Sequence, residues 1–266
     1  MITYRKKLCR IGELWFDEEP GDARVDVVRF FQRPAPLPGV HCEEFYSLVI
    51  DLGQDLEAIL ADLDADVRYR LRRAERDGLV YERCDPGDRA LLAGFCHFYD
   101  EFASLKGLPP INRARLWAYA SQGALELSRV GTAGNGTLVW HAYYRGGQRV
   151  RGLHSASLYR RSADSSHRSL VGRANSYLHW QDMVTFKAEG IIWYDMGGWY
   201  PGRADAAKLG INKFKEDFGG RLVRGFNGET GVTGKGRLLL WLRDAWRRPG
   251  TPGEDPTRPG LSGEGA

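Results

Sequence analysis

The residues best suited to chemistry lie between Asp195 and Lys215, in the second half of the chain. Asp195 ends a predicted buried strand, and Gly197 and Gly198 soon after it permit a ligand to approach the backbone closely. A carboxylate in this position could orient an incoming ammonium group or relay its proton. The alternative is a turn aspartate whose side chain binds the backbone of the Gly197–Gly198 loop.

Two lysines, Lys213 and Lys215, flank Phe214 on a predicted short helix. An ammonium group beside a reacting carbonyl can stabilise the negative charge that develops on its oxygen. The alternative is that both lysines are solvated on an exposed helix face.

An aromatic and basic loop follows the strand and carries Trp199, Tyr200 and Arg203. Loops carry binding residues more often than packed strands do, and this set suits a nucleotide or a sugar. Aromatic residues in such a loop are as often part of the core. Tyr194 lies next to Asp195, and because side chains alternate along a strand, only one of the two can line a cleft.

Two histidines are candidate bases. His154 lies in a predicted strand, and His179 precedes Trp180 on a predicted long helix. A neutral imidazole can accept a proton near neutral pH. The alternative is that both are structural residues whose hydrogen bonds are satisfied within the fold.

A helix early in the chain carries acids first and arginines last. Arg72 and Arg76 are four residues apart, share a helix face with Arg68, and could form a phosphate-facing strip. The alternative is that the order of charges only complements the helix dipole.

The elements that must position these residues form a mixed α+β arrangement with a largely antiparallel meander and one β-helix-β crossover. Residues 1–50 are predicted to be strands and loops. Apolar residues at three-and-four spacing predict one helix from Leu56 to Ala74. The remaining pattern predicts helices at 85–107, 112–123, 170–189, 211–218 and 238–247, and strands at 79–83, 124–130, 137–144, 149–158, 191–196 and 222–226.

Three segments, taken in their order and spacing, resemble a known family. They are Arg68–Gly78, the stretch from Leu178-His179-Trp180 through Gly190 to Tyr194–Gly198, and Gly210–Gly220. The set resembles the FemAB/FemX-like branch of the GNAT acyltransferase superfamily, over roughly residues 45–226.

The resemblance implies a GNAT fold, in which a mixed, mostly antiparallel sheet is flanked by helices. It implies an acyl-donor cleft where two neighbouring parallel strands splay apart, which are Arg149–Leu158 and Ile191–Met196 in this chain. It also implies that the lysine just after the phenylalanine, Lys215, sits beside the donor ester.

The activity implied is N-acyl transfer, in which an aminoacyl group passes from aminoacyl-tRNA to an amine, typically on a peptidoglycan precursor. Related members use acyl-CoA, and a non-catalytic GNAT-like binding module is a third possibility. No bound cofactor is expected. The acceptor, the group transferred and the oligomeric state stay open.

The chain departs from the family in two places. Members that use CoA have a glycine-containing pyrophosphate loop before the long helix, and here the pattern is shifted, with Arg168, Gly172 and Arg173. Arg168 and Arg173 could hold phosphate together with the N–H groups of the helix N-terminus, yet the incomplete pattern favours aminoacyl-tRNA. The chain is also short for two GNAT domains. We predict a remnant of a first domain at residues 1–50, one GNAT-like domain at 51–248 and a disordered tail at 249–266.

Composition adds limits. The 266 residues carry 38 basic and 34 acidic side chains, a net charge of +4, which fits an anionic partner without demonstrating one. A C-terminal excess of arginine and lysine would suit a tRNA acceptor stem or a solvated surface. Four widely spaced cysteines predict reduced thiols rather than disulfides, and no metal-ligand spacing occurs. No apolar run reaches the ~18 residues of a membrane helix, so we expect a cytoplasmic protein.

Overall fold

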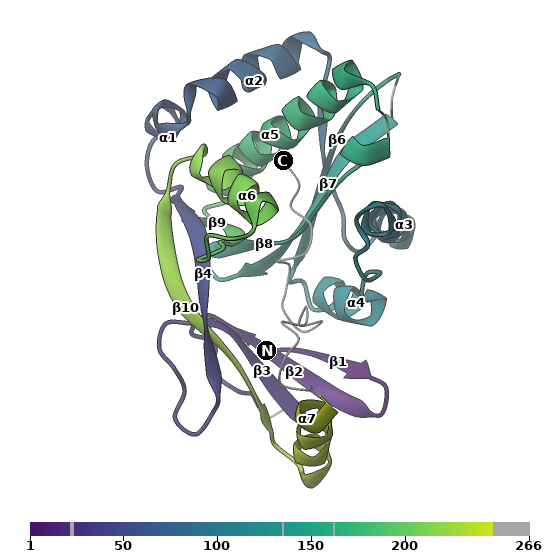
Figure 1. Ribbon diagram of the computed structural model, residues 1–266, viewed down its shortest axis with the longest axis vertical. Coiled ribbons are helices and arrows are strands. Elements are labelled where there is room, and N and C mark those ends of the chain that lie inside the picture. Colours follow the sequence, from purple (N-terminus) through teal and green to yellow (C-terminus); the bar gives the residue numbers. More distant parts are fainter. Residues whose placement is uncertain (22–23, 135, 162, 247–266) are drawn as a thin grey trace. The chain divides into compact units, whose positions relative to one another are not determined.

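The computed structural model describes residues 1–21, 24–134, 136–161 and 163–246 (Figure 1). They form two compact units. The first contains Met1–Tyr46, Asn112–Gly123 and the described residues from Val223 onward, and the second contains Ser47–Ile111 and Ala124–Leu222. The division therefore differs from the boundary predicted at residue 50, because two later segments join the N-terminal strands. The tail predicted at 249–266 lies outside the described residues.

The first unit is a small sheet with two helices. Its strands run in the order β1-β2-β3-β10, with β2 and β3 parallel and the other neighbours antiparallel. The elements are β1 (Ile2–Lys6), β2 (Cys9–Trp15), β3 (Val27–Arg33), α4 (Arg113–Ser121), β10 (Arg221–Gly231) and α7 (Gly234–Trp246).

A buried polar cluster explains why α4 belongs to this unit. Glu13 on β2 is fully buried and accepts hydrogen bonds from Tyr4 Oη at 2.7 Å and from Arg115 Nε at 2.9 Å. Trp15 Nε1 donates to Tyr119 Oη on α4 at 2.7 Å. The two contacts with α4 join positions about a hundred residues apart in sequence, so no local pattern predicts them.

The second unit is a larger sheet covered by helices. Its strands run in the order β4-β9-β8-β7-β6-β5, and all neighbours are antiparallel except β8 and β9. The strands are β4 (Cys42–Asp51), β5 (Val80–Cys84), β6 (Leu125–Thr132), β7 (Gly136–Gly146), β8 (Arg149–Ser157) and β9 (Trp193–Gly198). The helices are α1 (Leu56–Asp62), α2 (Ala65–Arg76), α3 (Arg89–Lys106), α5 (Ser165–Ala188) and α6 (Ala206–Glu216), with a short 3₁₀ turn at Tyr159–Arg161.

Helices α3 and α5 cover opposite faces of this sheet (Figure 1). Two neighbouring residues of β8 show the two faces. The ring of His154 lies 4.8 Å from that of Tyr99 on α3, whereas Ser155 Oγ donates to Asn175 Oδ1 on α5 at 3.4 Å. No helix within the described residues combines the length and apolarity that crossing a bilayer requires.

The helix predicted over Leu56–Ala74 is wrong in one respect, because it is two helices. Leu63 is extended, and Asp64 begins α2 by accepting a hydrogen bond from Asp66 N at 2.8 Å. An aspartate with this local bond favours a helix start over helix continuation. Arg68 then donates to Ala61 O at 2.9 Å and closes the end of α1.

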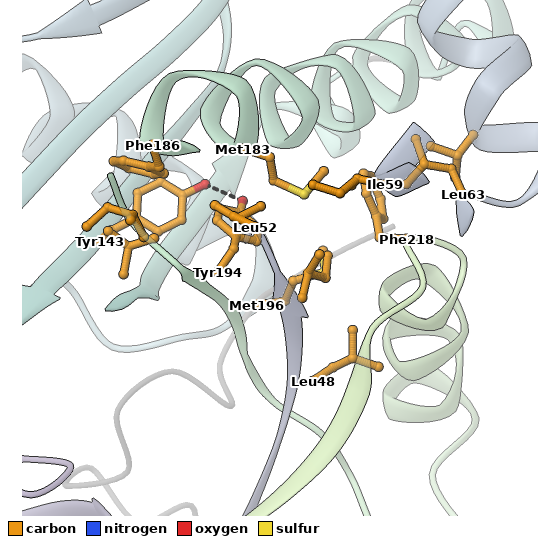
Figure 2. Close-up of a cluster of buried hydrophobic side chains, with 14 of the residues drawn as sticks. Leu48, Leu52, Ile59, Leu63, Tyr143, Met183, Phe186, Tyr194, Met196 and Phe218 are labelled. Carbon is orange, nitrogen blue, oxygen red and sulfur yellow. Dashed lines mark hydrogen bonds between the residues drawn. The ribbon is translucent and has the colours of Figure 1, made fainter. Parts of the chain in front are cut away.

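The apolar core of the second unit collects side chains from β4, α1, α5, β9 and α6 (Figure 2). Ile59 and Leu63 pack with Leu48 and Phe218, and Met183 on α5 is fully buried in the same cluster. Burying each of these side chains contributes roughly 1.5–3 kcal/mol. The core thereby fixes α6, the helix that carries Lys213 and Lys215, against β9.

Candidate active site

Strands β8 and β9 stop pairing at the place predicted for the donor cleft. They lie parallel and pair from Arg149–Arg151 to Trp193–Asp195. β8 continues to Ser157 and β9 to Gly198, yet the described residues form no further pair between them. Two strands that both continue without pairing diverge, and they do so toward the C-terminal ends.

Lys215 lies at this end of β9. It is on the packed face of α6, is only 2% exposed, and its Nζ donates a hydrogen bond to the backbone oxygen of Gly198. Lysine is almost never buried this completely without a partner. The alternative of a solvated lysine therefore does not describe Lys215. It does describe Lys213, which is 69% exposed and pairs with Asp217.

Helix α6 also holds the loop that follows β9. Asn212 Oδ1 accepts from Tyr200 N at 2.9 Å, and its Nδ2 donates to Tyr200 O at 2.7 Å. Trp199 Nε1 donates to Glu216 at 2.8 Å. Asn212, Lys215 and Glu216 thus fix three successive residues, Gly198 at the end of β9 and the loop residues Trp199 and Tyr200. Two further candidates predicted from the sequence are Arg203 in the loop, which is exposed, and Phe214 on α6, which is buried.

Asp195 is fully buried, and both of its carboxylate oxygens have donors. Oδ2 pairs with Arg149 on β8, and Oδ1 accepts from Gly197 N at 2.8 Å. This is the geometry of the turn aspartate considered from the sequence. Asp195 and Lys215 therefore bind the backbone of two neighbouring residues, Asp195 through Gly197 N and Lys215 through Gly198 O.

Tyr194 points to the other face of β9, as alternation predicts, and enters a buried chain of hydrogen bonds. Its Oη lies 2.6 Å from His179 Nδ1. It also lies 2.7 Å from Tyr143 Oη, the bond that is dashed in Figure 2. Tyr143 Oη donates to Asp182 Oδ2 at 2.6 Å, and His141 Nδ1 lies 2.9 Å from the same oxygen. Because a carboxylate only accepts, the hydrogens along this chain can all point toward Asp182.

His179 ends the chain beside α6. Its ring lies 5.3 Å from that of Phe218 and 5.7 Å from that of Phe214. Burial, with smaller effects of His141 and Lys215, holds the pKa of His179 well below its usual range, so the ring is neutral at pH 7. With Nδ1 donating along the chain, Nε2 is an acceptor, and it has no hydrogen-bond partner among the described residues.

The network around Asp182 was not predicted from the sequence, although a signal existed. His141 and Tyr143 are two apart on a strand, and Asn175, His179 and Asp182 are four and three apart on a helix. Each set therefore shares one face of its element. The other candidate base, His154, faces α3 on the opposite side of the sheet, so the two histidines do not form one site.

Comparison with known proteins bears on the fold. The chain matches no protein-family model, and no curated protein matches it by sequence. Among solved structures it is similar to FemX, with a TM-score of 0.57 and 14% identity over 74% of this chain and 63% of that chain. The chain thus spans less than two thirds of FemX. It is also similar to the C-terminal domain of a protein assigned as a lysylphosphatidylglycerol synthetase from Agrobacterium fabrum (TM-score 0.52, 14% identity, 85% of this chain and 75% of that one). A third is L-PGS from Bacillus licheniformis (0.51, 14%, 82% and 72%).

The fold is GNAT-like, of the FemX kind. This confirms the predicted α+β class and, at the level of the fold, the resemblance drawn from the three sequence segments.

Within this GNAT-like fold the loop considered for phosphate is helical, which corrects the prediction that the long helix begins near residue 170. α5 begins at Ser165, so Arg168 and Arg173 lie inside it. Asp164 is its N-cap and accepts from Ser166 N and His167 N, each at 3.1 Å. A carboxylate therefore already occupies the helix N-terminus.

Of the other arginines predicted to bind phosphate, one is paired with a carboxylate and two are exposed. Arg173 Nε is bonded to Asp77 at 2.5 Å, at the end of α2. Arg72 and Arg76 are exposed on α2. Arg68 lies near the start of α2 and donates to Ala61 O at the end of α1, a contact that neither the phosphate strip nor the helix-dipole alternative predicted.

A hollow of about 350 Å³ lies at the opposite end of β9, lined by Trp193 and, from other segments, Asp51, Asp62, Phe218 and Arg221. Since Trp193 begins β9 and Gly198 ends it, this hollow is separate from the Lys215 end of the strand.

Proposed function

We propose that this chain is an N-acyltransferase that moves an aminoacyl group from aminoacyl-tRNA to an amine. The observation that carries the proposal is the buried ammonium group of Lys215, held at the end of β9 where β8 and β9 stop pairing. A preorganised cation in a site shielded from water stabilises developing negative charge far better than one in solvent.

The chemistry asks little else of the protein, because an aminoacyl ester is already reactive. The amine nitrogen attacks the ester carbonyl carbon and forms the C–N bond, and the carbonyl oxygen becomes an oxyanion that Lys215 stabilises. Collapse of this intermediate breaks the bond to the ribose oxygen. The nitrogen loses one proton, and the departing ribose oxygen gains one.

We assign proton acceptance to His179. Its Nε2 has no hydrogen-bond partner among the described residues, and its Nδ1 is bound to the chain that ends at Asp182, an arrangement that orients the imidazole and keeps it neutral and able to accept a proton. The donated proton can then pass from Nε2 to the leaving ribose oxygen. Asp195 has a positioning role, since it fixes the Gly197 amide next to the carbonyl that Lys215 binds.

Two observations support aminoacyl-tRNA over acyl-CoA as the donor. The N-terminus of α5 is occupied by Asp164, so the described residues hold no free helix-terminus site there for a pyrophosphate. In addition, Arg72 and Arg76 present two cations on an exposed helix face, which suits a phosphate backbone.

The test presents both donors with a small soluble amine, glycinamide. We expect the purified chain to transfer label from charged tRNA to glycinamide, and RNase treatment of the tRNA to abolish the transfer. Thiol release from acetyl-CoA or another acyl-CoA, with activity that survives RNase, would overturn the tRNA donor and leave an acyl-CoA enzyme. Absence of transfer from either donor would overturn the catalytic proposal.

A further inference from the structure

Helix α7 in the first unit exposes a broad apolar face. Trp241 is 65% exposed, Leu238 55% and Leu242 44%, and the spacing of three and four residues places them on one side of the helix. Leu239, at 37%, borders the same face. Contiguous apolar patches of this kind on a soluble protein mark surfaces that bind something.

The opposite side of α7 is held against the sheet of the first unit by two contacts. A Cβ atom at Gly236 would lie only 1.9 Å from Asp26 O, which shows how closely the helix backbone approaches the start of β3. Arg243 pairs with Glu229 on β10. The packed side fixes the direction in which Leu238, Trp241 and Leu242 point, away from the sheet.

Positive charge lies beside the apolar face. Lys235 and Arg237 lie in the first turn of α7, and its described residues, 234–246, contain three basic residues and one acid, a sum of 3 − 1 = +2. Basic residues beside Leu and Trp on one amphipathic helix are the composition of helices that lie in the headgroup region of a bilayer.

A second exposed segment lies next to this helix. Leu8, at the turn between β1 and β2, is 85% exposed, and Lys235 Nζ donates a hydrogen bond to its backbone oxygen. Lys6 and Lys7 precede Leu8 in the chain. The apolar side chain at the tip of the β1–β2 turn is thus also flanked by cations, and the turn meets α7 at its first residues.

We propose that α7 and the β1–β2 turn form a docking surface for a bilayer with anionic headgroups. Leu238, Trp241, Leu242 and Leu8 enter the boundary between headgroups and acyl chains, while the lysines and arginines around them contact the lipid phosphates. At 13 residues α7 lies in this boundary and does not cross it.

The charge pattern argues against a second copy of the chain as the occupant. A two-fold interface places the same surface of each copy against the other. Lys235, Arg237 and the β1–β2 lysines of two copies would then face one another and repel. An anionic membrane satisfies the apolar face and the cations together.

The experiment is vesicle flotation of the full chain. Vesicles contain phosphatidylcholine alone or with about a third phosphatidylglycerol, an anionic fraction that attracts basic segments. We expect the chain to float with the anionic vesicles, to float poorly with neutral ones, and to be released by high salt because salt screens the headgroup charge. A chain that stays in solution with anionic vesicles overturns the proposal.

A matched pair of variants locates the surface. Trp241→Gln with Leu242→Gln should lower the vesicle partition coefficient about tenfold, since two exposed apolar anchors are lost. Leu105→Gln, on α3 and 42% exposed, should leave it unchanged. Equal flotation of both variants overturns the assignment to α7. The assignment is also overturned if the wild-type chain and Leu105→Gln are dimers in solution and the Trp241/Leu242 variant is a monomer. Transfer to glycinamide should be the same in all three proteins, so failure here is distinguishable from failure of the proposed function.

Discussion

Burying a lysine costs free energy that only its setting can offset. Lys215 is 2% exposed and its ammonium group donates to Gly198 O. An exposed lysine would instead form its hydrogen bonds with water. Such a group is preorganised for an anion because the protein has already removed its water and fixed its direction. The cost of burial is thus the physical reason for expecting Lys215 to meet negative charge.

Replacing Lys215 by Met tests this role. Methionine keeps the length and most of the apolar volume of the side chain but removes the cation, so we expect turnover of charged tRNA to fall about 10²–10³-fold with a small change in Tm. Lys106→Met, at the end of α3, is the control and should retain the wild-type rate. An unimpaired Lys215→Met enzyme would remove this lysine from the mechanism.

His179 gives a prediction about pH. Its pKa in the folded chain lies well below the value of 6.5 that it has when unfolded, so folding below that pH must displace a proton. The stability contributed by the neutral ring is therefore present above about pH 6.5 and is lost at about 1.4 kcal/mol per pH unit below it. We expect the drop in Tm between about pH 7.5 and pH 5.5 to be smaller in His179→Gln than in wild type.

The control for this measurement is His97→Gln. His97 is exposed on α3, so this variant makes the same change of side chain outside the apolar core. Identical pH dependence in wild type and His179→Gln would mean that folding does not lower the pKa of His179, which contradicts a buried ring that excludes the proton.

Single residues differed in how far the sequence could determine their role. Alternation along β9 correctly separates Tyr194 from Asp195, because it is a property of every strand. The partners of Tyr194 could not be derived in the same way. Tyr143 and His179 lie 51 and 15 residues from it in sequence and become neighbours only when β7, α5 and β9 pack together.

Helix α6 acts as an element and not only through Lys215. Asn212 is buried and binds both the N–H and the C=O of Tyr200, so its side chain replaces a backbone pairing that the loop lacks. Helix α6 therefore positions the loop after β9, and Phe214 and Phe218 in the apolar core fix the helix itself.

Asn212→Ala should loosen this loop. Two partly buried backbone groups lose their partner, which costs up to about 1–3 kcal/mol, and Lys215 loses part of the framework that directs it. We expect faster amide exchange at Tyr200 and a lower transfer rate. Asn112→Ala, at the N-cap of α4, should leave exchange at Tyr200 unaltered. Unchanged exchange at Tyr200 in Asn212→Ala would show that the loop is held by other contacts.

The sequence predicted the order of the elements better than their ends, because single capping residues set where two of the helices begin. The apolar stripe through Leu56–Ala74 predicted helix correctly, but Asp64 divides it, and Asp164 starts α5 before the apolar pattern begins. An aspartate can cap a helix, lie within one or sit in a loop, and its choice depends on what the following residues pack against. Periodicity alone therefore predicts the α5 core but not its first turn.

At the scale of the molecule, the chain crosses between its two units within β4 and β10, and again just before and just after α4. Each unit has its own buried polar network, centred on Glu13 in the first and on Asp182 in the second. A sequence read from one end to the other suggests a boundary near residue 50. Contacts of α4 and β10 with the N-terminal strands replace that boundary by a discontinuous one.

Glu13→Gln tests whether the two units are stabilised separately. Glu13 is fully buried against Arg115, and burial together with Glu13 raises the pKa of Tyr4 and keeps its hydroxyl protonated as a donor. A neutral amide leaves the Arg115 charge uncompensated, which costs about 3–5 kcal/mol. We expect amide exchange to accelerate in β1, β2, β3 and α4 while β7 and β8 keep wild-type protection.

The control is Glu19→Gln, which removes an exposed carboxylate of the same unit and should change exchange in neither unit. Equal acceleration in both units would mean that the chain unfolds as one cooperative structure, whereas confinement to the first unit would mean that the candidate site remains folded when the other unit is weakened.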